Sequence, residues 1–150
     1  MEYVLIIKVL IAAGLGSLIG LEREVSRKVA GIRTHALVSL ASALFTSISV
    51  DAFRDQVLTA GYDPTRIISN IIVGIGFIGA GAILKKNDRV EGTTTAAGLW
   101  AVAAVGVTVG VGLYREAVIV TVLVYGILQS LWIIEKRIRR HMGLKEEHND

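Results

Sequence analysis

The residues best able to do chemistry gather in one short stretch near the start of the chain, GLEREVSRKVAGIRTHALV. We regard five of them as a functional polar cluster: Glu22, Arg23, Arg33, Thr34 and His35. A carboxylate such as Glu22 could bind a cation or exchange a proton, and a nearby arginine would hold it ionised. His35 could exchange a proton near neutral pH. The same residues could instead form an ion-paired elbow that only fixes the two flanking segments.

A second set of side chains carries oxygen atoms that could hold a magnesium ion. Asp51 and Asn70 each border a long apolar segment. Magnesium typically takes one or two carboxylates and keeps several waters. We therefore treat Asp51 and Asn70 as candidate metal ligands and Mg²⁺ as the candidate cofactor, although acidic residues in a loop are ordinarily solvated. The chain contains no cysteine, which excludes disulfides and thiolate metal sites.

The stretch GIGFIGAGAIL, residues 74–84, contains the glycine spacing of a dinucleotide-binding turn. Such a turn needs a preceding strand and an acidic residue about 20 positions further on. Here the glycines lie inside an apolar segment, so the nucleotide interpretation fails. The sequence also lacks a nucleophile, base and acid in a catalytic pattern, and we expect that the protein is not an enzyme.

Helix packing is the better interpretation of these glycines, because small residues let helices approach closely in lipid. Glycines at 3.6-residue spacing groove the 67–84 segment on two faces, and we expect it to be central, held between two neighbours. A helix broken to expose carbonyls to an ion is the alternative. The glycines assigned to packing are Gly16, Gly20, Gly74, Gly76, Gly79, Gly81, Gly106 and Gly110.

Five long apolar segments must position these residues, in a chain that is 53% hydrophobic with a mean hydropathy of +0.60. A membrane-spanning helix needs roughly 20 apolar residues. We predict an all-α polytopic membrane protein whose bundle of five transmembrane helices fills residues 1–134, followed by a basic cytoplasmic tail at 135–150. Buried helices of a soluble protein are the alternative. One of Thr93–Thr95 should cap the fourth helix. The predicted helices are residues 3–21, 35–53, 67–84, 95–113 and 117–134.

The basic residues alternate along the chain in a way that orients these helices. Twelve of the 16 Lys and Arg residues fall between the first and second segments, between the third and fourth, and after the fifth. Basic connections stay on the cytoplasmic side. This predicts an N-terminus outside, a C-terminus in the cytoplasm, and a first segment retained as an anchor. The pI of about 9.4 therefore reflects membrane orientation, and we expect no nucleic-acid partner.

Three blocks of the sequence resemble the signature segments of the MgtC/SapB family of membrane proteins: GSLIGLERE with AGIRTHALV, IVGIGFIGAGAIL, and EGTTTAAGLWAVAAVGV. The resemblance spans about Gly14 to Gly112. It implies a multi-pass protein of the inner membrane, linked to growth in low magnesium, with the ATP synthase among the membrane machines that such proteins regulate. Many relatives continue into a soluble C-terminal domain, whereas we expect only the basic tail here.

Two functional classes follow. A regulator would bind other membrane proteins through a lipid-facing helix or the connection from Arg23 to Arg33. A carrier of magnesium or another cation would need a polar route between Glu22 and Asp51. The intervening segments offer no carboxylate at mid-membrane, so we favour regulation. Glycine-rich faces on several helices exceed what one small bundle needs, and we expect a homo-oligomer in the lipid bilayer.

Overall fold

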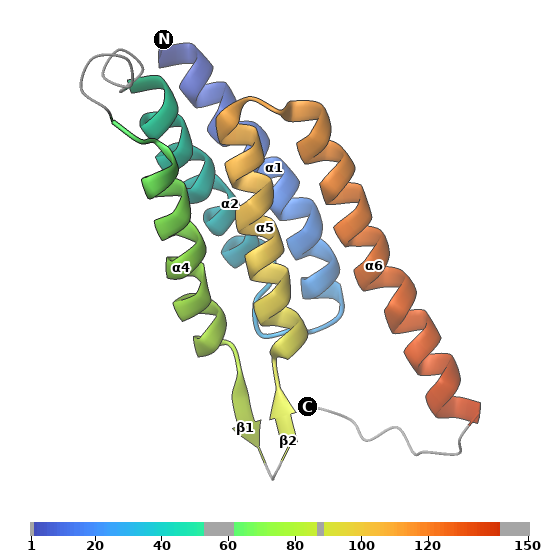
Figure 1. Cartoon of the computed structure of the whole chain (residues 1–150). Helices are drawn as coiled ribbons and strands as arrows, with labels where there is room; N and C mark the ends of the chain where they lie inside the picture. Colours follow the sequence, from blue (N-terminus) through green and yellow to red (C-terminus); the bar gives the residue numbers. More distant parts are fainter. Residues whose placement is uncertain (1, 53–61, 87–88, 142–150) are drawn as a thin grey trace.

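A computed structural model describes residues 2–52, 62–86 and 89–141, with side chains in the last helix described through residue 130. The described chain is almost entirely helical and contains five long α-helices (Figure 1). Phe53, at the end of the predicted second span, and residues 142–150 of the predicted tail lie outside this part. The elements are α1 (Glu2–Val25), α2 (Ile32–Ser47), the π-helical segment η1 (Ile48–Ala52), α4 (Thr65–Gly81), β1 (Leu84–Lys86), β2 (Arg89–Glu91), α5 (Thr93–Val111) and α6 (Tyr114–His141).

Two element boundaries differ from the sequence prediction. Helix α4 ends at Gly81, and Leu84 begins a short antiparallel hairpin in which it pairs with Glu91. Helix α6 continues to His141, well into the segment predicted as a tail. Both differences arise because hydropathy marks where apolar residues stop, whereas backbone hydrogen bonding can continue or change at another point.

Helix α5 lies at the centre of the bundle and contacts α1, α2, α4 and α6 (Figure 1). Our expectation that the glycine-rich helix α4 is central is therefore wrong. Helix α4 packs on one side of α5 and touches α2 only lightly, while α6 packs on α1 and α5. Small residues decide the centre, because the side chains of α5 that face α2 are Gly106 and Gly110.

Local backbone geometry sets both ends of α5. Gly92 precedes the helix with φ of +87°, and no threonine side chain caps it, so the predicted threonine cap is wrong. A Cβ atom at Gly92 would lie only 1.9 Å from the carbonyl oxygen of Ala82, which requires glycine there. Gly112 ends the helix with φ of +99°, and Leu113 N–H donates to Thr108 O in a left-handed cap.

Successive helices run in alternating directions, so the basic connections meet at one end of the bundle (Figure 1). The α1–α2 connection and the β1–β2 hairpin both lie at that end, where α6 also finishes. The N-terminus of α1, the segment η1 and the α5–α6 turn lie at the opposite end. Helices α1, over Tyr3–Val25, and α5 are long and apolar enough to cross a membrane, while the apolar α4 is shorter at 17 residues.

Candidate functional site

The first polar site, which we term the Glu22 cluster, consists of Glu22, Arg23, Ser26 and His35 at the end of α1 and the start of α2. Glu22 and Arg23 are 4% and 2% exposed, and the Arg23 Nε donates to one oxygen of Glu22. The Ser26 hydroxyl donates to the other oxygen at 2.8 Å. Both carboxylate oxygens are therefore occupied. This resembles the ion-paired elbow more closely than an open cation site.

His35 is fully buried beside this pair, and both charges lie close enough to act on it electrostatically. Its Nδ1 donates to the carbonyl oxygen of Gly31 at 2.9 Å, which leaves Nε2 as an acceptor. No hydrogen-bond partner for Nε2 is present in the described chain. Two other members of the predicted cluster do not join this buried group, since Arg33 is exposed and Thr34 is half-buried.

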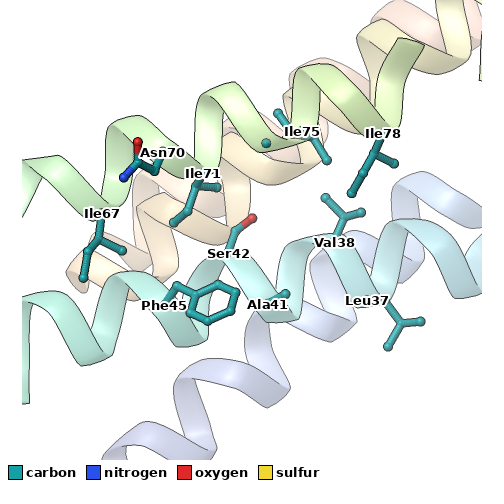
Figure 2. A pocket seen from close by; sticks show the side chains of 11 residues that line it. Leu37, Val38, Ala41, Ser42, Phe45, Ile67, Asn70, Ile71, Ile75 and Ile78 are labelled. Carbon is teal, nitrogen blue, oxygen red and sulfur yellow. The ribbon is translucent and has the colours of Figure 1, made fainter. Parts of the chain in front are cut away.

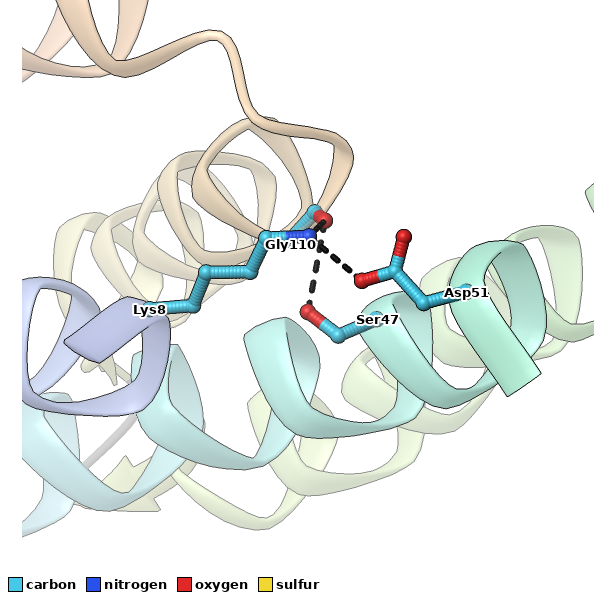
Figure 3. A network of polar contacts seen from close by, with 4 residues as sticks. All are labelled: Lys8, Ser47, Asp51 and Gly110. Carbon is cyan, nitrogen blue, oxygen red and sulfur yellow. Dashed lines mark hydrogen bonds and ion pairs between the residues drawn. The ribbon is translucent and has the colours of Figure 1, made fainter. Parts of the chain in front are cut away.

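The second polar site lies at the other end of the bundle and was missed by the sequence interpretation. This Lys8 cluster consists of Lys8, Ser47, Asp51 and Gly110 (Figure 3). The Lys8 ammonium donates to Asp51 Oδ2 at 2.7 Å and to the Gly110 carbonyl at 2.9 Å. The Ser47 hydroxyl donates to the same carbonyl at 3.3 Å. The signal was available, because a lone charge inside an apolar span is a functional candidate by itself.

The two candidate metal ligands lie in different surroundings. Asp51 contacts the Lys8 ammonium, which supplies the positive charge that a metal ion would otherwise provide. Asn70 lines an apolar groove between α2 and α4 with a volume of about 530 Å³ (Figure 2). Its neighbours there include Phe45, Ile67 and Ile71. Among the described residues, no group of three or more His, Cys, Asp or Glu side chains could hold a metal ion.

A row of polar side chains on α2 connects the regions of the two clusters. We term it the α2 polar face; it has 4-3-4-3 spacing, which keeps its members on one side of a helix, and all are buried: His35, Ser39, Ser42, Thr46 and Ser49. The hydroxyls of Ser39 and Thr46 have no hydrogen-bond partner in the described chain. The other side of α2 exposes apolar side chains such as Leu37 and Phe45.

Glycines of α1 and α5 cover the α2 polar face. A Cβ atom added at Gly16 or Gly20 would lie 2.6 Å from His35 O or 2.7 Å from Ile32 Cα. One added at Gly106 would lie 2.2 Å from Ser39 O, and one at Gly110 would lie 2.6 Å from Thr46 Cβ. These four glycines allow three helices to approach more closely than any larger residue would permit.

The four glycines of α4 have different surroundings. A Cβ at Gly79 would make an ordinary contact with Ala96 at 3.5 Å. Around Gly74, Gly76 and Gly81, no other group of the described chain lies within 4 Å of the Cβ position. Their predicted packing role therefore requires something other than the helices of the same chain.

Comparisons with known proteins give this chain a family context. Residues 9–137 match the model of the MgtC family. The chain is 40% identical over 132 residues to "Putative magnesium transporter YhiD" of Escherichia coli K12, an alignment covering 87% of this chain and 59% of that protein. It is 42% identical over 113 residues to "Protein MgtC" of Brucella abortus, with coverage of 75% and 45%. "Protein SapB" of Bacillus subtilis is 35% identical over 156 residues, with coverage of 95% and 67%.

The matched region spans about three-fifths of the first of these relatives, so their full length extends beyond what this chain aligns with. No solved structure matches the chain.

Proposed function

The chain belongs to the MgtC family, and on that premise we propose that it is a multi-pass protein of the cytoplasmic (inner) membrane that acts in adaptation to low magnesium by binding and regulating other membrane proteins. The family match agrees with the resemblance found in the three sequence blocks and supports a magnesium-related membrane protein. Regulation, the number of membrane crossings and their orientation are the further steps of this proposal.

The distribution of apolar and polar side chains supports a lipid surroundings for the whole bundle. Phe77 and Val73 on α4 are 85% and 74% exposed, while the hydroxyls of the α2 polar face are buried. Water would disfavour this arrangement, because large apolar patches on soluble proteins are rare. In lipid, the apolar outer surface is solvated, and helices associate through small residues and polar contacts. This supports five crossings, with α2 and η1 acting as one span.

The proposed orientation places the end with the basic connections in the cytoplasm. The chain has no natural cysteine, so single cysteines can be introduced as reporters. We expect Lys28→Cys to react with a membrane-impermeant maleimide only after the membrane is permeabilised. Arg115→Cys, at the opposite end, should react in intact cells. The reverse labelling pattern would show that the orientation is wrong.

The observation that favours regulation over transport is the internal pairing of the buried charges. Glu22 is paired with Arg23, and Asp51 is paired with Lys8. The α2 polar face between them contains only neutral hydroxyls and His35. Moving a divalent cation through this region would strip its water without a free carboxylate to replace it.

The connection between α1 and α2 is the surface that we propose for partner binding. Arg27, Lys28 and Arg33 are exposed there and form a basic patch at one end of the bundle. The partner is another membrane protein; the family resemblance implies the ATP synthase as a candidate. We expect Arg33→Ala to reduce both partner capture and growth in low magnesium, while Arg115→Ala at the opposite end should do neither. Full capture by Arg33→Ala would exclude this surface.

Transport of magnesium or another cation is the second candidate, favoured by the α2 polar face that extends between the two charged clusters. The printed name of the E. coli relative points the same way. Liposomes containing only the purified protein provide the test. Robust Mg²⁺ uptake that is lost in Asp51→Asn would reverse our preference, whereas uptake no faster than in empty liposomes would support regulation.

A homo-oligomer completes the proposal. Exposed glycines in a helix cost stability relative to alanine unless a close contact compensates for them. Gly74, Gly76 and Gly81 have no such contact within the described chain, and Gly74 also borders the groove between α2 and α4. Cross-linking in native membranes should yield a dimer or larger species through cysteines introduced beside these glycines. Recovery of monomer alone would exclude the oligomer.

A further inference from the structure

The Lys8 ammonium occupies a position defined by oxygen atoms from two other parts of the fold. Asp51 provides a carboxylate oxygen at 2.7 Å from η1, and Gly110 provides a carbonyl oxygen at 2.9 Å from α5 (Figure 3). Ser47 places its hydroxyl against the same carbonyl. Carboxylate, carbonyl and hydroxyl oxygens are the ligands that hard cations use in proteins.

Helix geometry adds to the attraction for positive charge at this position. Gly110 lies in the last turn of α5, where carbonyl groups lack helical partners and carry the negative end of the helix dipole. Asp51 adds a full negative charge. It belongs to a π-helical segment of five residues, an uncommon conformation that is frequently found at functional sites.

Access to the position is uneven. Lys8 is only 6% exposed, whereas the Asp51 side chain is 45% exposed. Its carboxylate can therefore be reached from the solution at this end of the bundle while it holds the lysine. Lys8 also lies within about two turns of the start of α1. Its flexible stem could carry the ammonium group towards that end, as lysines near membrane surfaces do.

We propose that Asp51, Gly110 O and Ser47 form a cation site whose resting occupant is the ammonium group of Lys8, and that a divalent cation from solution competes with Lys8 for Asp51. When the cation binds, Lys8 loses its contacts with η1 and α5. Those contacts tie α1 to the other two elements, so cation concentration controls how firmly α1 is held. This proposal rests on the magnesium-related function proposed above and gives it a sensing element.

A fixed structural ion pair is the competing explanation, and substitution of the lysine separates the two. Lys8→Met keeps an unbranched apolar stem and removes the internal cation. We expect MgCl₂ to raise the unfolding midpoint of purified Lys8→Met along a saturating curve, by roughly 3–6 °C at ten times the dissociation constant. The double variant Lys8→Met with Asp51→Asn should lose this response. Lys28→Met, which removes an exposed lysine at the other end, should behave like the unsubstituted protein.

Ionic strength is held constant with N-methylglucamine chloride, whose cation is too large for the position. Equal responses of Lys8→Met and the double variant to MgCl₂ would overturn the cation site. Both variants are compared after size-exclusion chromatography, and the double variant keeps the site neutral, so a folding defect of the single variant would be recognised.

Competition in the unsubstituted protein is tested by the reactivity of Lys8 with an amine-directed reagent, read by mass spectrometry. We expect Mg²⁺ to increase labelling of Lys8 several-fold and to leave Lys28 unchanged. Labelling of Lys8 that is insensitive to Mg²⁺ would overturn the competition. These measurements use purified protein alone, so their failure would leave the growth and partner-capture tests of the proposed function unaffected.

Discussion

Substitution of Gly106 by alanine tests most directly whether close approach of α2 and α5 holds the bundle together. The added Cβ would lie 2.2 Å from Ser39 O and 2.8 Å from Ser42 Cβ, whereas ordinary contact begins at 3.4 Å. Because the first of these atoms belongs to the backbone, no side-chain rotation relieves the clash. The two helices must separate locally by about 1 Å.

The energetic cost follows from two opposing effects. Overpacking of this kind typically costs about 1–3 kcal/mol. Alanine recovers up to about 1 kcal/mol through its higher helix propensity. We expect Gly106→Ala to lose about 2 kcal/mol in net stability. Gly126→Ala is the matched control, since no other group lies within 4 Å of its Cβ position. It should gain about 0.5–1 kcal/mol, because only the propensity effect remains.

Thermal unfolding of the two purified variants in the same detergent measures the difference. About 3 kcal/mol between them corresponds to roughly 6–12 °C in the unfolding midpoint for a chain of this size. Gly106→Ala should be the less stable variant. Equal midpoints, or a more stable Gly106→Ala, would refute the conclusion that this glycine is required for the contact between α2 and α5.

Three further predictions concern other parts of the fold. Glu22→Ala leaves the buried Arg23 unpaired and should cost about 3–5 kcal/mol in thermal unfolding, and adding Arg23→Ala should recover part of the loss. Gly92→Ala should cost at least about 2 kcal/mol because of its positive φ and its clash with Ala82 O; Gly112→Ala, with open space around it, should cost less, and the reverse order would contradict this. Hydrogen bonds from the Thr65 hydroxyl and amide lower the pKa of Asp63 below its usual 3.8. Since the folded-state pKa is the lower one, the stabilisation is present above the unfolded-state pKa and is lost as the pH falls through the folded-state pKa, so Asp63→Asn should flatten acid sensitivity below about pH 4.

Much of the helical fold could be predicted from hydropathy because each apolar run is a local feature. The described helices fall near the five predicted segments, and the alternating basic connections meet at one end of the bundle. The β1–β2 hairpin was not foreseen. Its three-residue strands are too short to show a periodic pattern, and they exist only through pairing with each other.

The candidate sites were less predictable. Glu22, Arg23 and His35 were identified because polar residues at the edge of apolar segments stand out in sequence. Lys8 was counted only as a lone charge, since its partner Asp51 is 43 residues away and its other contact, Gly110, is 102 residues away. Pairing over such separations depends on how the helices are arranged, which no local pattern contains.

The sequence by itself determined the apolar segments, the glycine content and the alternation of charge, because these follow from composition along the chain. Only the tertiary structure decided that Gly106 and Gly110 pack tightly while Gly74, Gly76 and Gly81 meet nothing in the described chain. The physical reason is the solvent that we propose. Lipid solvates apolar side chains as well as a protein interior does, so hydrophobicity does not mark which face of a helix is buried. Shape and polar pairing choose that face, and both become visible only when the helices are placed together.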